Sequence, residues 1–456
     1  MQHKRNANYD LTTDGILKKL FVIALPVMGT QLIQMSYNLT DMFWLGRLPS
    51  GTVAVAASGT CGLFLWLSMS LLMMGRMGAE IGVSQSLGRG DAAAARGYGE
   101  NAFMLSAVLG VLFGLALFFL RSPLIGFFAI QEAEVVSSAE GYLAIVSIGI
   151  PFSFMTAAMV GCFNGSGNSR VPFFVNAAGL IINMALDPLF IFGFDMGVAG
   201  AAVATVIAQG VSFLLMALAV RRSTSRPFGS FRFFTKPGAQ ILKQIFRWSA
   251  PISAESAFFT IMTMISTSMV SPFGQDALAV GRIGSQIESM TWLIGGGYGS
   301  ALVAFMGQNC GAGLWSRIRR GFKLSLWAMG TWGILVTLLL WFLGGDLFRF
   351  FLPDPGVQQL GIVYLRILAF CQIPQCLEAV SGGTFKGIGR TLPPSIVSVA
   401  TNVLRVLLAW VFVNIWGVLG VWGAISLTSL LRGLSSMVWY LLSARRQPRT
   451  AEARII

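Results

Sequence analysis

The sequence predicts an all-α integral membrane protein, with twelve transmembrane helices arranged as two pseudo-symmetric lobes of six helices. Three observations support this fold class: the composition, the length of the apolar segments and an internal repeat. Of the 456 residues, 55% are hydrophobic and only 11% are charged, whereas a soluble domain contains about 25% charged residues. The mean hydropathy is +0.72. We therefore expect the chain to lie in a lipid bilayer.

Twelve apolar segments are long enough to cross a bilayer, which takes about 20 residues in an α-helix. Glycine, proline and basic residues separate them, as in the stretches RLPSG and NGSGNSRVP, and such stretches favour turns over helices. The expected spans are residues 20–44, 53–78, 98–120, 141–163, 172–193, 198–220, 248–272, 279–306, 323–344, 360–384, 392–416 and 418–442.

Lysine and arginine are unevenly divided between alternate loops. The N-terminal tail, the loops after the even-numbered segments and the C-terminal tail hold most of them, while the opposite loops hold mainly Arg47, Arg121, Arg282 and Arg349. Basic loops stay on the cytoplasmic side. We therefore expect a multi-pass protein of the inner (cytoplasmic) cell membrane with both termini in the cytoplasm. The same distribution explains the net charge of +14 without nucleic-acid binding.

Several classes of chemistry are not supported by the residues present. His3 is the only histidine, and the five cysteines lie in or beside apolar segments without metal-ligand spacing. No phosphate-binding loop or nucleophile–base pair is apparent, so we expect no enzyme, no ATP-driven pump and no cofactor. The N-terminal tail leads into an apolar run that is too long for a signal peptide.

The two halves of the chain repeat each other. Five residue pairs recur at a spacing of about 223 residues: Pro26 and Pro251, Gln85 and Gln308, Pro151 and Pro374, Pro172 and Pro394, and Thr205 and Thr428. Six segments per half give both halves the same orientation, a plan that is typical of alternating-access transporters. The predicted domains are a cytoplasmic tail (1–19), an N-lobe (20–220), a cytoplasmic linker (221–247), a C-lobe (248–442) and a cytoplasmic C-terminal tail (443–456).

One apolar stretch, LIINMALDPLFIFGF, contains an aspartate. Asp187 follows Asn183 by four residues, so both side chains share one helix face. A carboxylate near the bilayer centre costs about 2.5–3.5 kcal/mol and usually faces a cavity or a partner. At the repeat spacing Asp187 corresponds to Ala409 and Asn183 to Arg405, so this pair belongs to the first lobe only. A purely structural Asn–Asp pair is the alternative.

Two other polar residues are expected in the same layer. From the helix rise of about 1.5 Å per residue, Asp187, Thr205 and Asp41 all fall in the outer half of the membrane. Two neighbouring carboxylates in a low dielectric cannot both stay charged. We expect them to hold a proton, or a hard cation together with the oxygens of Asn183 and Thr205.

The second lobe has acids of its own. Glu255 and Glu378 each lie about 12 Å from the cytoplasmic end of their segments. They are either a second cation or substrate site, or structural partners of Arg366, Arg405 or Arg432. Three further acids near the cytoplasmic loops are expected to be solvated or interfacial: Glu80, Asp91 and Glu100.

These stretches resemble the multidrug and toxic compound extrusion family along essentially the whole chain. The resemblance depends on QMSYNLTDMFWLGRL in the first segment, QSLGRGDAAAARG after the second, GCFNGSGNSRVP after the fourth, NMALDPLFIFGF in the fifth and GVAGAAVAT in the sixth. It implies two six-helix lobes around a V-shaped cavity. It also implies export of cationic, amphipathic drugs in exchange for protons or sodium.

The resemblance also implies roles for individual residues. The first-lobe site for H⁺ or Na⁺ would consist of Asp41, Asn183, Asp187 and Thr205, and the residues lining the substrate would include Gln34, Tyr37 and Asn176. Glu255 resembles an acid of the seventh helix that sodium-coupled members use. The aspartate that those members carry in the tenth helix has no match here, although Glu378 lies nearby.

We therefore expect a monomeric, cation-coupled antiporter whose partners are cationic or amphipathic small molecules and the lipid bilayer. The main alternative is a flippase for lipid-linked precursors, which would need basic side chains such as Arg366, Arg405 and Arg432 for the pyrophosphate. A receptor or channel is less favoured, because no sensor domain or pore loop is apparent. A transporter of the major facilitator type would leave Pro26 and Asp41 unexplained.

Overall fold

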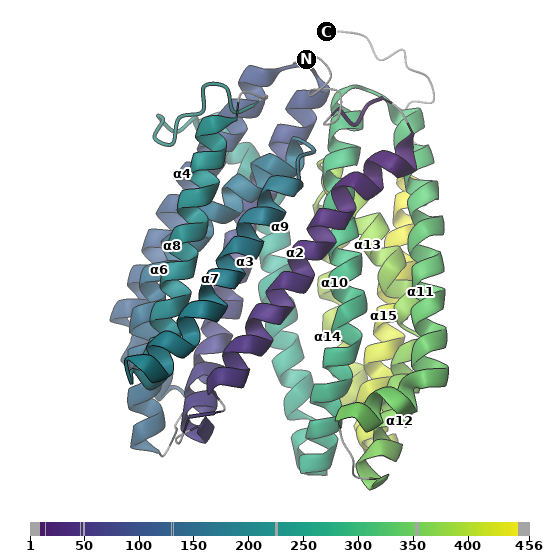
Figure 1. Cartoon of the computed structure of the whole chain (residues 1–456). Coiled ribbons are helices and arrows are strands. Elements are labelled where there is room, and N and C mark those ends of the chain that lie inside the picture. The colour runs from purple at the N-terminus through teal and green to yellow at the C-terminus, as the bar shows by residue number, and fades with distance from the viewer. Residues whose placement is uncertain are drawn as a thin grey trace. The chain divides into compact units, whose positions relative to one another are not determined.

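The computed structural model describes residues 10–13, 15–45, 47–48, 51–128, 130, 132–223, 227–351 and 355–445. This part of the chain is built from helices (Figure 1). They are α2 (Ile16–Leu45), α3 (Gly51–Gly88), α4 (Ala92–Phe119), α5 (Arg121–Gly126), α6 (Ala133–Gly165), α7 (Arg170–Pro188), η1 (Leu189–Gly193), α8 (Gly197–Arg222), α9 (Ala239–Ser268), η2 (Ser271–Phe273), α10 (Gln275–Gly311), α11 (Trp315–Phe351), α12 (Pro355–Ala369), α13 (Gln372–Gly387), α14 (Leu392–Trp416) and α15 (Val418–Ala444).

The twelve predicted segments each correspond to a helix or a helix pair, which confirms the fold class. Within the described residues, ten helices are long and apolar enough to cross a membrane, and α12 with α13 makes eleven. The remaining segment is α10, which spans 37 residues. It includes Asp276, Arg282 and Glu288, and these charges lower its mean hydropathy.

The tenth predicted segment is broken in the middle. Helices α12 and α13 meet at an angle of 41° at Phe370 and Cys371. Pro374 lies in the first turn of α13, where it has no N–H to donate and its ring would clash with the carbonyl of Phe370 in a continuous helix. Its counterpart in the repeat, Pro151, lies inside the unbroken helix α6. The same residue type therefore gives different structures in the two halves.

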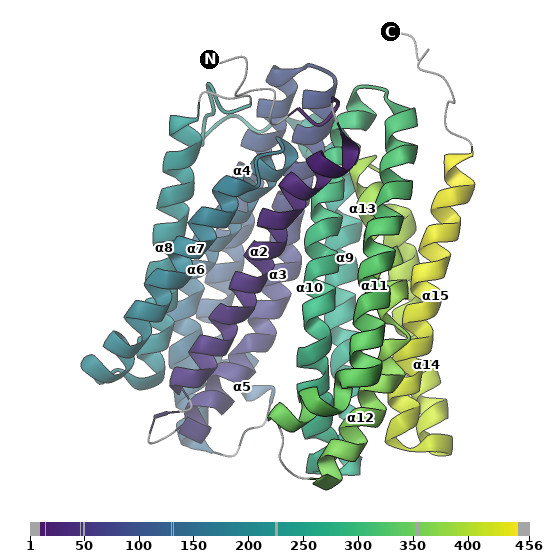
Figure 2. The same ribbon diagram turned by 45° about the vertical axis from the view of Figure 1, so that its right-hand side comes forward.

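The chain forms two compact units, of which the first comprises residues 25–253. Helix α6 packs along α3, α4 and α8 within it (Figure 2). Glycines on α6 allow the closest of these contacts. A Cβ atom at Gly161 would overlap the carbonyl group of Arg76 on α3, and one at Gly165 would lie 2.7 Å from the carbonyl oxygen of Glu80.

We expect Gly161→Ala to destabilise the first unit by about 1–3 kcal/mol, because the added methyl meets rigid backbone. The measurement is thermal melting of the detergent-purified protein, followed by tryptophan fluorescence. The control is Gly210→Ala in α8, where an added Cβ has no neighbour within 4 Å and alanine favours the helix. Equal melting temperatures for the two variants would contradict this account of the α3–α6 contact.

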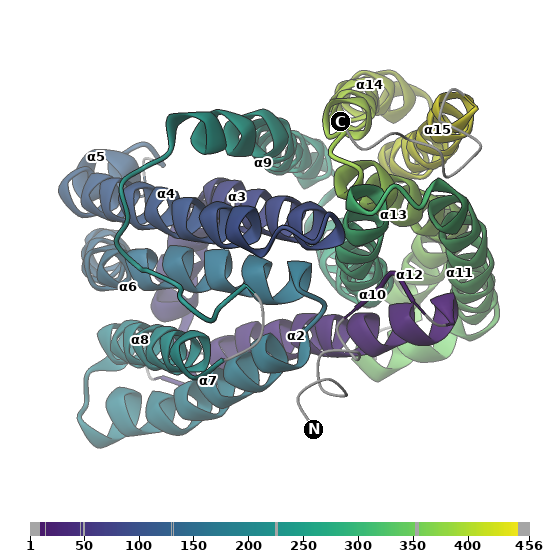
Figure 3. The same cartoon turned by 90° about the horizontal axis from the view of Figure 1, so that it is seen from above.

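The linker between the halves is folded onto the first unit, and residues 227–238 run across the ends of its helices (Figure 3). The backbone N–H of Arg232 donates to Glu100 and that of Gly238 donates to Asn101, both at 2.8 Å. Phe228 packs against Phe163 with tilted rings whose centroids lie 4.3 Å apart. These contacts bring together residues far apart in the sequence.

The linker contacts correct one sequence-based expectation. Glu100 is only 7% exposed and Glu80 is fully buried beside Arg76, with an N–O distance of 4.0 Å. Both acids are therefore buried in the protein, whereas the sequence predicted solvated or interfacial positions. Glu100 is buried because the linker covers it, and Glu80 because the glycines of α6 bring that helix close to α3. Asp91 is exposed as predicted and caps α4, accepting from the N–H of Ala94 at 2.8 Å.

The second unit comprises residues 254–456 together with residues 11–24. Helix α13 lies against α10, α11 and α15. The N-terminal segment is held at Leu11, whose N–H donates to Gln308 at 3.0 Å and whose carbonyl accepts from Asn309 at 3.1 Å. Arg317 donates to the carbonyl of Thr13 at 3.1 Å. Leu11 is 1% exposed, so this segment is part of the packed unit.

Two helices take part in both units. Helix α2 passes from the second unit to the first between Ala24 and Leu25, next to Pro26. Helix α9 begins in the first unit and passes to the second after Ser253, close to Pro251. Each unit therefore contains the beginning of the other half's first helix.

Candidate functional site

Helix α7 buries a single stripe of residues. Its buried positions are Pro172, Val175, Gly179, Asn183 and Asp187, a spacing of three or four that places them on one helix face. The N-terminal part of this stripe is apolar, and its C-terminal part carries the amide of Asn183 and the carboxylate of Asp187. At Gly179 a Cβ atom would overlap the hydroxyl of Ser212 on α8, so α7 and α8 approach closely along this face.

The predicted Asn–Asp pair is present. The side-chain amide of Asn183 donates to Oδ1 of Asp187 at 3.2 Å, and both residues are 0% exposed. Within the described residues, the amide oxygen Oδ1 of Asn183 is buried and accepts no hydrogen bond. A buried acceptor of this kind costs stability unless something else binds it. An oxygen in this position can accept a hydrogen bond or coordinate a small cation.

The chain changes conformation immediately after Asp187. Pro188 has no N–H to donate to Met184, which interrupts the α-helical pattern. Residues Leu189–Gly193 follow as a π-helix, in which Phe194 donates to the carbonyl of Leu189 at 2.9 Å. Such π-turns occur frequently at functional sites. Asp187 thus lies at the last α-helical turn before an irregular one.

The structure describes the other residues predicted for this site only in part. Thr205 lies on α8, which packs against α7, and is 6% exposed. Asp41 lies in the last part of α2, but its side chain and that of Tyr37 are outside the described residues. Gln34 is exposed on α2. Asn176 is half-buried and donates to the carbonyl of Pro172 at 2.8 Å, within its own helix.

This arrangement offers oxygen ligands of the type that hard cations prefer. Carboxylate and amide oxygens stand next to each other, and a hydroxyl lies on the neighbouring helix. A proton or Na⁺ is compatible with them, because a single buried carboxylate balances one positive charge. In the described part of the chain, no three His, Cys, Asp or Glu side chains are grouped as a metal site.

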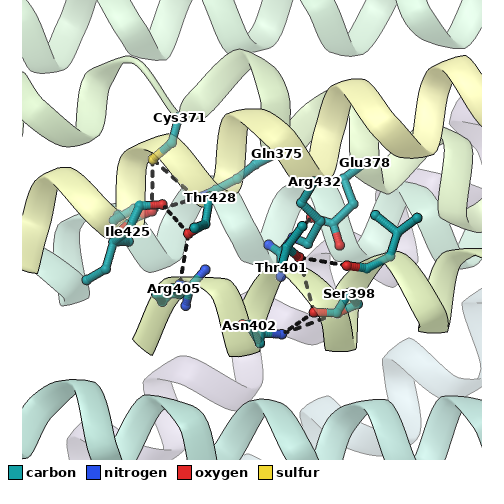
Figure 4. Close-up of polar contacts among 12 residues, drawn as sticks. Cys371, Gln375, Glu378, Ser398, Thr401, Asn402, Arg405, Ile425, Thr428 and Arg432 are labelled. Carbon is teal, nitrogen blue, oxygen red and sulfur yellow. Dashed lines mark hydrogen bonds and ion pairs between the residues drawn. The ribbon is translucent and has the colours of Figure 1, made fainter. Parts of the chain in front are cut away.

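A larger polar network lies in the second unit (Figure 4). Glu378 on α13 forms an ion pair with Arg432 on α15, with a distance of 2.8 Å between oxygen and Nε. Glu255 on α9 accepts from the hydroxyl of Ser395 on α14 at 2.9 Å. Of the two predicted acids, Glu378 therefore has an arginine partner and Glu255 has a hydroxyl.

Glu288 on α10 joins this network, although sequence reasoning did not include it in a site. Its carboxylate accepts from Gln375 at 2.6 Å and from the thiol of Cys371 at 3.5 Å. Cys371 lies at the break between α12 and α13, and Gln375 lies in the first turn of α13. A charged residue at the centre of a bilayer-length segment was the signal available in the sequence, but its partners lie about 85 positions away.

The buried arginines of this unit differ in their surroundings. Arg405 on α14 is 7% exposed, and its Nε donates to the hydroxyl of Thr428 at 3.3 Å. Its guanidinium carbon lies 6.0 Å from the ring centre of Phe259. Arg366 is exposed on α12 and lies over Trp341 at 5.6 Å. Arg366 is thus placed as a surface residue, while Arg405 and Arg432 belong to the network.

Relatives of the whole chain carry related names. The chain is 28% identical over 438 residues to a probable multidrug resistance protein NorM of Thermotoga maritima, covering 93% of this chain and 92% of the relative. It is 20% identical to the multidrug export protein MepA of Staphylococcus aureus, covering 97% and 98%.

Solved structures share the fold. An outward-facing multidrug resistance MATE family transporter of the MOP superfamily superposes with a TM-score of 0.87 at 20% identity, covering 97% of this chain and 99% of that one. A family model, MatE, matches residues 26–189 and 251–411. These two stretches cover α2 to α7 and α9 to α14, which is most of both repeats. The chain therefore belongs to the MatE family, the multidrug and toxic compound extrusion family that its sequence motifs predicted.

Proposed function

We propose that this protein is a cation-coupled antiporter that exports cationic, amphipathic small molecules from the cytoplasm by alternating access. The relatives are named for multidrug resistance and export, and their chains match this one from end to end. In this proposal the protein is a transporter without enzymatic activity, and it needs no cofactor other than its coupling ion, H⁺ or Na⁺.

The observation that carries this proposal is the buried pair on α7. Asp187 and Asn183 are completely buried in an apolar helix, where a permanent charge without compensation is costly. A cation bound by Asp187, Asn183 and Thr205 would remove this cost, and its release would restore it. We assign Asp41 on α2 to the same site, and Gln34, Tyr37 and Asn176 to substrate binding, as the family resemblance implies.

The membrane potential and the cation gradient supply the free energy that would couple cation entry to drug export. An inside-negative membrane potential favours cation entry by about 2.3 kcal/mol per charge per 100 mV. Cation binding in the state open to the outside would therefore be followed by release inside, and drug would be carried in the opposite direction. The exchange of one cation for one monovalent drug would cancel the electrical part, so that only the concentration gradient drives it.

The second unit supports a second site in this scheme. Glu255 is bound only through a hydroxyl and Glu288 through an amide and a thiol, so neither carboxylate is neutralised by a direct ion pair within the described residues. We assign Glu255 and Glu378 to a second cation or substrate site, with Glu288 as an additional member.

The test is transport in proteoliposomes with proton and sodium gradients imposed separately. We expect ethidium efflux to be driven by at least one of the two gradients and to stop when an ionophore collapses it. Efflux that is indifferent to both gradients would contradict the proposal. The alternative, a flippase for lipid-linked precursors, is favoured only by the buried Arg405 and Arg432, and it predicts binding of a lipid pyrophosphate but no gradient-driven ethidium transport.

A further inference from the structure

The linker between the two halves of the chain is strongly basic. Residues 221–247 contain seven lysine and arginine residues and no acidic residue. Residues 227–238 run across the helix ends of the first unit (Figure 3), on the side that the basic loops predict to be cytoplasmic. Two acids towards these ends of α3 and α4, Glu80 and Glu100, are buried. The linker therefore adds positive charge to the surface at this end of the unit.

Aromatic side chains hold the linker against the first unit. Phe228 is 3% exposed, and the partly buried Phe231 and Phe233 pack against the same cluster. The ring centroids of Phe233 and of Phe103 on α4 are 5.2 Å apart. Together with the two backbone hydrogen bonds to side chains of α4, these contacts fix which side of the linker faces the protein.

The opposite side of the linker combines basic and aromatic side chains. Exposure alternates along residues 231–236, and the exposed positions are Arg232, Phe234 and Lys236, which we call the linker face. The side chain of Phe234 is 84% exposed, although its neighbour Phe233 packs against the protein. Basic side chains next to an exposed aromatic ring are typical of segments that bind an anionic membrane surface.

The linker face lies at the depth expected for the membrane surface. The N–H groups of Arg232 and Gly238 donate to two consecutive residues of α4, Glu100 and Asn101, at 2.8 Å. These α4 residues are the third and fourth of the third predicted span, about 3–5 Å inside its cytoplasmic end. Lipid headgroups extend several ångströms beyond the hydrocarbon core. Phe234, between the two attachment points, is therefore placed where headgroups and acyl chains meet.

We propose that the linker face is a membrane anchor that binds anionic phospholipid headgroups of the cytoplasmic leaflet. Arg232 and Lys236 bind headgroup phosphates, and the ring of Phe234 lies at the boundary with the acyl chains. The anionic leaflet attracts the basic side chains, and insertion of the ring removes apolar area from water. This inference concerns the attachment of the first unit to the bilayer and does not depend on the transport function proposed above.

The depth of position 234 is the first measurement. A fluorescent label is attached to Phe234→Cys in the full-length protein, in a Cys310→Ala background, because the other four cysteines are buried. The protein is placed in nanodiscs of phosphatidylcholine and phosphatidylglycerol that contain a lipid with a nitroxide quencher on its headgroup. The control is a label on Ala93→Cys, an exposed position of α4 that lies about 10 Å along the helix from Glu100, away from the bilayer.

We expect the label at position 234 to be quenched several times more strongly than the label at position 93. Equal quenching at the two positions would mean that the linker face lies in water, as expected for a surface that binds a soluble acidic partner. That result would overturn the proposal.

The preference for anionic lipid is the second measurement. A lipid that binds only the folded state raises the melting temperature of the detergent-purified protein, and phosphatidylglycerol should raise it more than phosphatidylcholine or inorganic phosphate. In Arg232→Gln with Lys236→Gln, the affinity for phosphatidylglycerol should fall about fivefold for each charge removed. The control, Arg320→Gln with Arg390→Gln, removes two charges from exposed positions of the second unit. Equal losses in the two double variants, or an equal response to inorganic phosphate, would contradict the anchor.

Variants of Phe234 test the part played by the ring. Because this side chain is exposed, Phe234→Ala should melt like the unchanged protein without lipid and should respond less to phosphatidylglycerol. Phe234→Trp should keep the full response, since tryptophan is favoured at membrane interfaces. An alanine variant that responds to phosphatidylglycerol as strongly as the tryptophan variant would refute the insertion of the ring and with it the anchor.

Discussion

Replacing Asp187 by asparagine is expected to lower gradient-driven ethidium efflux by about tenfold or more while the protein still inserts and folds. Asparagine has nearly the same shape and can keep a hydrogen bond to Asn183, now 3.2 Å away. It lacks the negative charge that would hold a proton or Na⁺ in an apolar helix. Efflux should be measured in proteoliposomes under the gradient that drives the unchanged protein, with protein amounts matched.

A nearby aspartate provides the control for this change. Asp195 is exposed after the π-helix and has a φ of 54°, a left-handed conformation that asparagine tolerates well. Asp195→Asn should therefore transport normally. If Asp187→Asn also transports at the normal rate, Asp187 is a structural residue and the first-unit cation site has to be abandoned.

Replacing Arg432 by methionine is expected to destabilise the second unit by about 3 kcal/mol, the lower end of the range for breaking a buried ion pair. Its partner Glu378 is 24% exposed on the side chain, so water offsets part of the loss. In this variant the carboxylate of Glu378 keeps only weaker interactions that stabilise its negative charge. We expect a clear drop in the melting temperature of the purified protein, whereas Arg366→Met at the surface should change little.

A double variant separates stability from function at this ion pair. Arg432→Met with Glu378→Gln removes both charges, and most of the lost stability should return because no uncompensated charge is left. If Glu378 also takes part in cation or substrate binding, transport stays low in the stable double variant. Normal transport together with recovered stability would assign the pair a purely structural role.

The fold was largely readable from the sequence because a bilayer imposes a length and a polarity on every segment. The exceptions depend on local chemistry and on packing. Pro151 and Pro374 occupy equivalent positions in the repeat, yet only Pro374 breaks its helix. Glu100 reads as a loop-side acid, but the folded linker buries it. Neither outcome is encoded in residue type or in spacing along the chain.

How far the candidate sites could be predicted from the sequence depends on whether the residues in contact lie on one helix or on different helices. Asn183 and Asp187 lie one turn apart on one helix, so their contact follows from spacing alone. The ion pair of Glu378 with Arg432 joins two helices, and the sequence offered three arginines as partners. Glu288 on α10 contacts Cys371 and Gln375, which lie at and just after the bend between α12 and α13. Contacts between distant helices need the tertiary structure.

The way in which α2 and α9 are shared has a consequence for the origin and the assembly of this molecule. The repeat suggests an ancestral gene duplication, yet each unit buries part of the other half's first helix in its interior. The first unit takes Ile245 and Trp248 of α9 into its interior, and the second unit takes Leu11 and Leu20 from the start of the chain. The two copies complete each other by exchanging helix ends, so a polypeptide cut between them would yield two fragments that are each missing a piece of their own interior.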